Sequence, residues 1–157
     1  YRLVNGTLRD NLLLGLGSLP DDKILAAAEK TGLDQTVAAH EMGLELPIQE
    51  GGRGLSGGQR TLVGLTRLLL MNPKIWLLDE PTANLDPNSE ARFMEILAKE
   101  LGTHRTLIVV THKPQLLNQF QRLIVMSRGR IAFDGPRDDV LKRVQLQAAQ
   151  RTTFQAT

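Results

Sequence analysis

The chain has 157 residues, of which 41% are hydrophobic and 23% charged, with a formal net charge of +2, which is ordinary for one soluble globular domain. Basic residues are scattered and aromatic residues make up only 4%, so we expect no nucleic-acid partner. The absence of cysteine excludes disulfides and thiol catalysis, and no apolar run reaches the ~18 residues of a membrane-spanning helix.

The N-terminal third predicts short helices. Asn5-Gly6-Thr7 is a turn signal before a helix start. Residues 20–42 predict two helices, the first started by Pro20-Asp21-Asp22 and stopped by Gly32, the second capped by Asp34. We expect six residues of these helices to face inward: Ile24, Leu25, Ala28, Val37, Ala38 and Met42. The pattern indicates packing rather than chemistry.

A glycine-rich stretch at 48–54 leads into the sequence Leu-Ser-Gly-Gly-Gln-Arg at 55–60. Ser56 is a good N-cap and Gln59 stands three residues later, a pattern that predicts a capping box. Gly57 and Gly58 place no side chain over the first helical N–H groups, so a phosphate could approach them and the positive end of the helix dipole. The apolar spacing continues the helix to Met71.

An apolar run at 74–78 predicts a strand that is buried on both faces, as in the middle of a parallel sheet. Asp79 and Glu80 follow at its carboxyl end, where open α/β sheets bind their ligands. One carboxylate there can hold a metal and the other can orient or deprotonate water. The sequence therefore predicts a magnesium-nucleotide site at this sheet edge.

A second helix and strand follow. Asp86 and Pro87 predict a helix start, and Gly102 predicts its end. Residues 105–111 predict a second buried strand, with His112 just past its carboxyl end. We therefore expect His112 at the same sheet edge as the two acids.

The C-terminal part predicts a short helix at 114–120 and a hairpin of strands 122–126 and 130–133. Gly135-Pro136 predicts the start of a last helix, with Val140, Leu141 and Val144 facing inward. Beyond about Gln145 the chain is polar and predicts a fraying tail. Alternating strands and helices favour an α/β fold with a mostly parallel sheet.

The sequence LSGGQR at 55–60, LLDEPTANLD at 77–86 and a lone His112 after the next apolar run together resemble the nucleotide-binding domain of ABC (ATP-binding cassette) proteins. The resemblance implies a three-layer P-loop NTPase fold with a helical subdomain. It divides the chain into a helical subdomain portion at 1–54, a RecA-like core portion at 55–145 and a flexible tail at 146–157. No GxxxxGK[ST] phosphate loop occurs, so we expect that Tyr1 is an internal cut and that the Walker A part is absent.

The resemblance also implies roles for site residues. Asp79 resembles the Walker B aspartate that holds Mg²⁺, Glu80 the catalytic carboxylate, and His112 the switch histidine that contacts the γ-phosphate. Residues 81–86 resemble the loop that crosses to a partner domain, with Ala83-Asn84 in place of the commoner Ser-Ala. The implied ATP-contacting residues are Leu55, Ser56, Gly57, Gly58, Gln59 and Asp86.

In this family two domains pair head to tail around ATP and couple its hydrolysis to a transmembrane domain. The resemblance therefore implies an exporter ATPase at the cytoplasmic face of a bacterial inner membrane. Residues 50–60, 111–117 and 128–141 look most like type I secretion exporters, which export large polypeptides; Thr61 departs from that subfamily's usual Gln. Glu50 fits equally a loop that contacts the membrane domain and a solvated linker residue.

Two other functions stay open. A DNA-maintenance ATPase shares the LSGGQ and Walker B sequences, although the compact segment at 20–42 replaces its expected long coiled coil. The other alternative is a non-catalytic piece that cannot bind ATP in cis, because the phosphate loop is absent. On this second interpretation the isolated chain is inactive even where its parent hydrolyses ATP.

Overall fold

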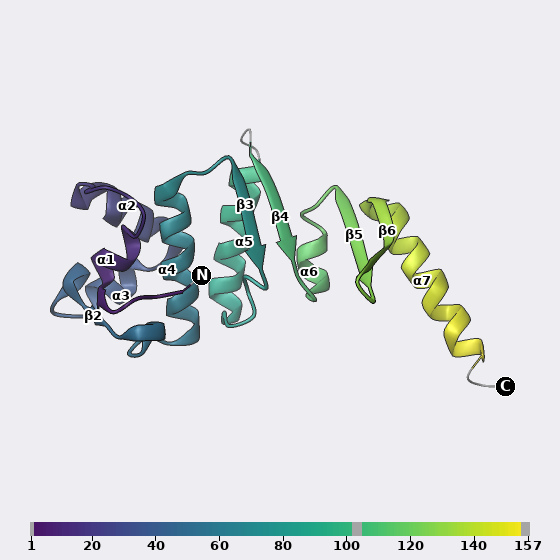
Figure 1. Ribbon diagram of the computed structural model, residues 1–157, viewed down its shortest axis with the longest axis horizontal. Helices are drawn as coiled ribbons and strands as arrows, with labels where there is room; N and C mark the ends of the chain where they lie inside the picture. The colour runs from purple at the N-terminus through teal and green to yellow at the C-terminus, as the bar shows by residue number, and fades with distance from the viewer. Residues whose placement is uncertain (1, 102–104, 155–157) are drawn as a thin grey trace. The chain divides into compact units, whose positions relative to one another are not determined.

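The computed structural model describes residues 2–101 and 105–154, which divide into two compact units, Tyr1–Thr111 and His112–Thr157 (Figure 1). The first unit contains β1 (Gly6–Thr7), α1 (Leu8–Leu12), α2 (Asp21–Thr31), α3 (Asp34–Ala38), β2 (Pro47–Ile48), α4 (Gly57–Met71), β3 (Ile75–Asp79), α5 (Pro87–Leu101) and β4 (Thr106–Val110), with 3₁₀ turns at Gly43–Glu45 and Glu50–Gly52. The second contains α6 (Pro114–Leu117), β5 (Arg122–Ser127), β6 (Arg130–Pro136) and α7 (Arg137–Phe154).

Helix α4 packs against α1 and α2, and the short antiparallel pair β1–β2 joins the same core. The predicted helices at the N-terminus are confirmed, and Gly32 ends α2 in the left-handed conformation, with φ of 87°. The core continues across the predicted boundary between residues 54 and 55. Its buried members are Leu3, Leu8, Leu12, Ile24, Ala28, Leu33, Leu44, Ile48, Leu55, Leu62 and Val63.

Four details of the predicted helical faces are wrong. Leu25, Ala38 and Met42 are exposed, and Asp34 is the first residue of α3 rather than its cap, which is Leu33. The buried stripe of α2 is narrow, and Leu25 lies about 100° around the helix from its buried neighbour Ile24. Helix α3 ends at Ala38, so Met42 shares no helical face with the residues of α3.

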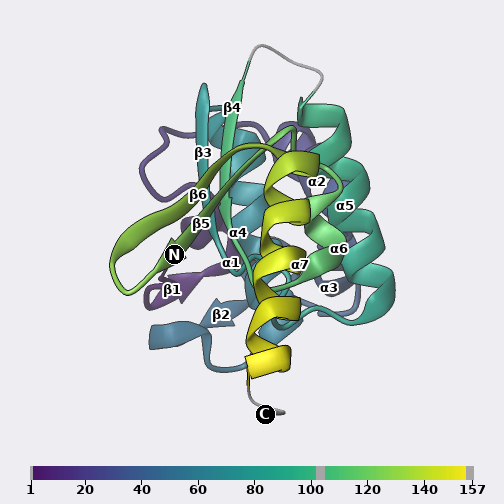
Figure 2. The same cartoon turned by 90° about the vertical axis from the view of Figure 1, so that its right-hand side faces the viewer.

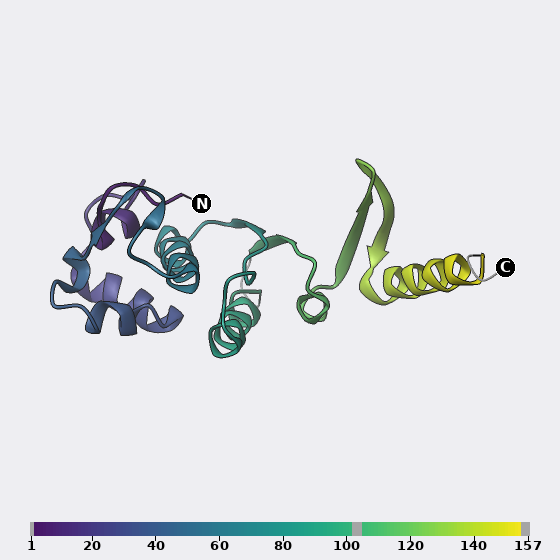
Figure 3. The same cartoon turned by 90° about the horizontal axis from the view of Figure 1, so that it is seen from below.

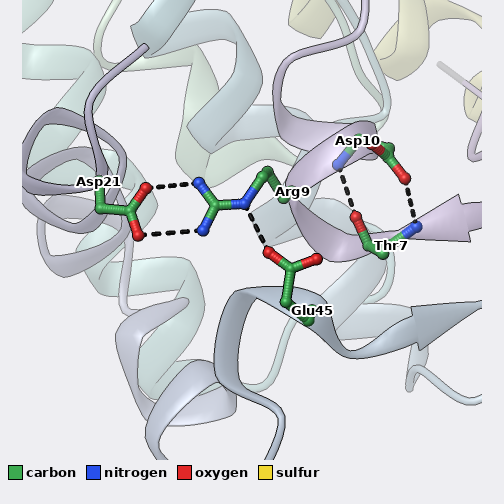
Figure 4. Close-up of polar contacts among 5 residues, drawn as sticks. All are labelled: Thr7, Arg9, Asp10, Asp21 and Glu45. Atoms are coloured by element: carbon green, nitrogen blue, oxygen red, sulfur yellow. Dashed lines mark hydrogen bonds and ion pairs between the residues drawn. The ribbon is translucent and has the colours of Figure 1, made fainter. Parts of the chain in front are cut away.

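Arg9 ties three segments of the first unit together (Figure 4). Its guanidinium donates two hydrogen bonds to Asp21, with Nη2–Oδ2 at 3.0 Å, and a third from Nε to Glu45 Oε1 at 2.6 Å. Thr7 and Asp10 form a reciprocal capping box at the start of α1. The network fixes α1 against the first turn of α2 and against the 3₁₀ turn that precedes β2.

Asn11 is fully buried, and its side chain forms hydrogen bonds with backbone groups of the segment before α1. Its Oδ1 accepts from Val4 N at 2.9 Å, and its Nδ2 donates to Val4 O and Thr7 O at 3.0 Å. Arg67 of α4 donates from Nε to Asn11 O at 2.7 Å. Because buried polar groups must be hydrogen-bonded, these contacts fix the N-terminal segment on α4.

Strands β3 and β4 are parallel and lie side by side (Figure 2), in register from Ile75 opposite Thr106 to Asp79 opposite Val110. This pair confirms the predicted parallel element of the α/β fold. Trp76 is 1% exposed; its indole donates to Pro73 O at 3.2 Å, and the Arg105 guanidinium carbon lies 5.4 Å from the ring centre. The predicted helix stop at Gly102 lies outside the described residues.

The prediction that β3 is buried on both faces is wrong for the described part of the chain. Helix α5 lies on one side of the β3–β4 pair (Figure 3), and it buries Phe93, Ile96 and Leu97. On the opposite side Leu77 is 72% exposed and Val110 57% exposed. Strand alternation explains the difference, because neighbouring residues point to opposite faces and only one face has a covering helix here.

In the second unit, β5 and β6 form an antiparallel hairpin that is followed directly by α7. Arg128 and Gly129 both have positive φ, the conformation that two-residue hairpin turns require. The predicted hairpin is confirmed, although β6 continues through Pro136, so α7 begins at Arg137 rather than at Gly135. Val140 is buried, and α7 remains helical through Phe154, beyond the point at which we expected a fraying tail.

Two ion pairs predict how the stability of the fold changes as the pH falls. The hydrogen bond from Arg9 lowers the pKa of Asp21 below its usual value of 3.8, and the Arg122 contact does the same for Asp134. A carboxylate with a lowered folded-state pKa stabilises the fold above pH of about 3.8, and the contribution is lost as the pH falls through the lower folded value. We expect the urea midpoint to fall in this acid range.

The variant Asp21→Asn should have a lower urea midpoint at neutral pH and a shallower acid loss than the wild type. Asp22→Asn is the matched control, since Asp22 occupies the same first turn of α2 but is not the carboxylate that Arg9 contacts. Equal acid slopes in the two variants would contradict a stabilising role for the Arg9–Asp21 pair.

Candidate functional site

The first turn of α4 is capped as the sequence predicts. Ser56 Oγ accepts from Gln59 N at 3.1 Å, and Gln59 Oε1 accepts from Ser56 N at 2.8 Å. Helix geometry leaves the N–H groups of Gly57 and Gly58 without partners inside the helix. They and the positive end of the dipole of a fifteen-residue helix are therefore available to an anion.

Side chains behind this turn hold it in place. Gln59 Nε2 donates to Thr36 Oγ1 at 3.3 Å, and Arg60 Nη1 donates to Leu55 O at 3.3 Å. A Cβ added at Gly52 would lie 2.6 Å from Arg60 Cδ, and Gly52 has φ of 77°. The positive φ of Gly52 and the close approach of Arg60 and Leu3 therefore all disfavour a side chain at this position, for reasons that the sequence alone did not reveal.

The two acids lie where β3 ends, as predicted. Asp79 is the last residue of β3 and is exposed, and Glu80 is half-buried. Glu80 N donates to Val110 O at 2.9 Å, which extends the pairing with β4 by one residue. Glu80 has φ of 44°, a conformation that is unfavourable for a non-glycine residue and that clusters at functional sites.

The chain turns sharply after Glu80 and passes beside α4. Ala83 N donates to Glu80 O at 3.2 Å, and Leu85 N donates to Thr82 O at 3.3 Å. Asp79 and Glu80 consequently share a pocket of about 300 Å³ with Gly57 of the same chain. The pocket also includes Arg2, Arg60 and Asn84, whose participation the sequence analysis missed. The position of Arg60 two residues after the glycine pair and that of Asn84 four residues after Glu80 are the signals that could have indicated these two residues, and the sequence holds no such signal for Arg2.

The other predicted site residues lie around this pocket or in the second unit. Ser56, Gly58, Gln59 and Asp86 line a neighbouring pocket of about 460 Å³, on another side of the same helical turn. Leu55 is buried in the core and contributes packing. A larger cavity of about 650 Å³ is lined mainly by α2 and α5 and contains neither Asp79 nor Glu80, so we place the candidate site in the smaller pocket.

Asp86 caps α5, as predicted. Its Oδ1 accepts from Asn88 N and Ser89 N, both at 3.0 Å, and its Oδ2 accepts from Ser89 Oγ at 2.6 Å. The Ser89 hydroxyl, followed by these backbone contacts, lowers the pKa of Asp86. His112 is exposed and opens the second unit, two residues after β4 ends.

The donor set at Asp79 and Glu80 fits Mg²⁺ that arrives with a nucleotide. Carboxylate oxygens suit this hard cation, which usually takes one or two protein carboxylates together with phosphates and water. Among residues 2–101 and 105–154, no group of three or more His, Cys, Asp or Glu could hold a metal. The described helices also include none that is long and apolar enough to cross a membrane.

A parallel strand pair that ends in two carboxylates beside a glycine-opened helix is an arrangement typical of nucleotide-binding α/β domains. Comparison with known proteins agrees. A family model described as "ABC transporter" matches residues 4–83, that is, 80 of the 157 residues. The chain belongs to the ABC transporter family.

The names of the relatives give transport of different cargoes. The glutathione/L-cysteine transport system ATP-binding/permease protein CydC of Escherichia coli is 38% identical over 90% of this chain, and the leukotoxin export ATP-binding protein LtxB of Aggregatibacter actinomycetemcomitans is 34% identical over 89%. The chain spans 24% and 20% of their lengths. A bacterial Atm1-family ABC exporter solved with ATP bound matches 95% of this chain and 27% of its own, with a TM-score of 0.83 and 29% identity.

The cap predicts a measurable loss of stability. Ser56→Ala should reduce the free energy of unfolding by about 1 kcal/mol, because Gln59 N loses its acceptor at the start of α4. Urea unfolding of the chain measures this. Ser18→Ala, at an exposed position outside any helix, is the control and should have an effect near zero. Equal effects of the two substitutions would show that the cap contributes nothing.

Proposed function

We propose that this chain is part of the ATP-binding and ATP-hydrolysing domain of an ABC exporter. Residues 1–54 belong to its helical subdomain together with α4, which packs on them, and the rest of the chain up to residue 145 belongs to its RecA-like core. The observation that carries the proposal is the pair of carboxylates, Asp79 and Glu80, where the parallel strand β3 ends, on a chain that belongs to the ABC transporter family. An isolated chain without the phosphate loop would then have little ATPase activity of its own.

In this proposal Asp79 holds Mg²⁺ and Glu80 orients or deprotonates the attacking water. Mg²⁺, when bound, neutralises charge on the phosphates. The strained backbone at Glu80 and its hydrogen bond to β4 support such a role, because they fix the carboxylate at the end of the strand. His112 contacts the γ-phosphate in the assembled domain.

We further propose that the first turn of α4 binds ATP held on a second domain in a head-to-tail pair. The exposed position of Ser56 and the two bare glycines support binding from outside the chain. Residues 81–86, including Asp86, then lie at the same interface. The Asp86 carboxylate already accepts hydrogen bonds from Asn88 and Ser89, which favours a role in holding this loop rather than in contacting phosphate directly.

The proposed partner on the other side is a transmembrane domain, which would place the chain at the cytoplasmic face of a membrane. A pocket of about 640 Å³ lined by Arg2, Asn5, Gln49, Glu50 and Arg53 is a polar surface that suits such a contact. The Glu50 side chain is 79% exposed there, which leaves it accessible to a partner. Type I secretion of polypeptides is the specific export function we propose, with LtxB and the RTX-I toxin translocation protein of Actinobacillus pleuropneumoniae as supporting relatives. The similarity to CydC makes transport of small thiols the second candidate.

Glu80→Gln in the complete protein tests the proposed reaction. The amide cannot accept the proton of the attacking water, so we expect Mg²⁺-dependent ATP turnover to fall by about 10²–10⁴-fold while ATP binding is retained. Phosphate release and nucleotide binding are measured in parallel. Glu95→Gln, on the exposed surface of α5, is the matched control. Unchanged turnover in Glu80→Gln would exclude Glu80 as the catalytic carboxylate.

Ser56→Arg tests the proposed pairing through α4. A long cation in place of the cap should obstruct the phosphate-binding turn, so ATP-dependent dimerisation should be lost while the circular dichroism spectrum is retained. Light scattering with and without Mg-ATP measures the dimerisation, with Ser18→Arg as the control. Normal pairing of Ser56→Arg would contradict phosphate binding at this turn.

A further inference from the structure

Residues 81–86 pass unusually close to the first turn of α4. A Cβ added at Gly57 would lie 3.2 Å from Asn84 Cβ and 3.6 Å from Asn84 Cγ. The first of these distances is shorter than ordinary van der Waals separation, so any side chain at position 57 would displace Asn84. Asn84 is itself exposed, so this contact is not a product of burial in the core.

Gly58 makes a different contact with the same loop. A Cβ added there would meet the backbone oxygen of Asn84 at 3.4 Å and Leu85 Cδ2 at 3.9 Å, both of which are ordinary contact distances. Position 58 therefore accepts a methyl group without a shift, whereas a methyl group at position 57 requires Asn84 to move by a few tenths of an ångström. The asymmetry separates two reasons for a glycine in this turn, namely access for a phosphate and space for Asn84.

Asn84 also lies on the short path that joins the turn to the catalytic carboxylate. The Ala83 N–H bonds to Glu80 O, so the loop that carries Asn84 is folded back on Glu80. Asn84, Gly57 and Glu80 all line the pocket of about 300 Å³. A shift of Asn84 would consequently move the wall between the phosphate-binding turn and the carboxylate.

We propose that Asn84 is a positioning residue that acts through Gly57: its side chain packs on the bare Cα of Gly57 and fixes the first turn of α4 relative to Glu80. This inference rests on the proposed function of that turn in binding the phosphate of ATP. It gives the glycine at 57 a steric role within its own chain, in addition to exposing N–H groups. It also gives a function to Asn84, which stands where the resemblance leads us to expect a smaller alanine.

A double-substitution cycle tests the contact. In the complete protein, Gly57→Ala should lower kcat/KM for ATP about tenfold, because Asn84 must move by a few tenths of an ångström and a full 1 Å misplacement costs about a hundredfold. Adding Asn84→Gly removes the atoms that the new methyl group meets, so the double variant should regain most of this loss. The control pair is Gly58→Ala with and without Asn84→Gly, in which the backbone oxygen remains and no recovery is expected.

The KM and kcat of each variant separate positioning from a general loss of structure. Recovery confined to the Gly57→Ala background supports the proposal, and equal effects of Asn84→Gly in both backgrounds overturn it. If the unsubstituted protein hydrolyses no ATP, the proposed function fails, and urea midpoints of the same variants then decide the contact itself. Asn84→Gly should raise the midpoint of Gly57→Ala relative to that of Gly58→Ala, and strictly additive midpoints would refute the packing.

Discussion

The N-terminal turn of α4 is the point on which the packing and the candidate chemistry of this chain both depend. The reciprocal bonds between Ser56 and Gln59 fix the turn without using the N–H groups of Gly57 and Gly58. Gln59 is held by Thr36, and the buried face of the same helix closes the core with Leu62 and Val63. A helix that is anchored along one face can present its free end to a phosphate with little loss of conformational entropy on binding.

Electrostatic contacts divide into two kinds in the first unit. Arg9 satisfies Asp21 and Glu45 fully within the chain, and this arrangement suits a structural clamp. Around the pocket, by contrast, the cationic side chains of Arg2 and Arg60 stand near Asp79 and Glu80 in a polar hollow. Phosphates and a divalent cation would complement both signs of charge there, and this favours a nucleotide over an uncharged ligand.

Local backbone strain coincides with the site. Glu80 has positive φ although it is not glycine, and the turn that follows packs closely against α4. Such a conformation persists only where neighbouring contacts hold it. Here they are the pairing with Val110 and the turn from Ala83. The position of the carboxylate is therefore determined by the β3–β4 pair and α4 together.

The sequence by itself determined the local elements whose causes are local. The Ser56 cap, the left-handed stop at Gly32, the Asp86 cap and the hairpin turn at Arg128-Gly129 follow from hydrogen bonds and backbone preferences within a few residues. The family and the α/β fold class followed from several such patterns in the right order. The resemblance of Asp79 and Glu80 to known acids also came from residue order and needed no coordinates.

Only the tertiary structure decided which residues meet across the chain. The helical spacing that predicted Leu25 and Met42 inward does not specify which stripe finds a neighbour, and the apolar run at 74–78 does not specify whether one sheet face or two are covered. The meeting of Gly57 with Asn84, and of Gly52 with Arg60, depends on segments that only packing brings together. Sequence patterns encode the periodicity of a single element, whereas contact distances between elements arise from the whole fold.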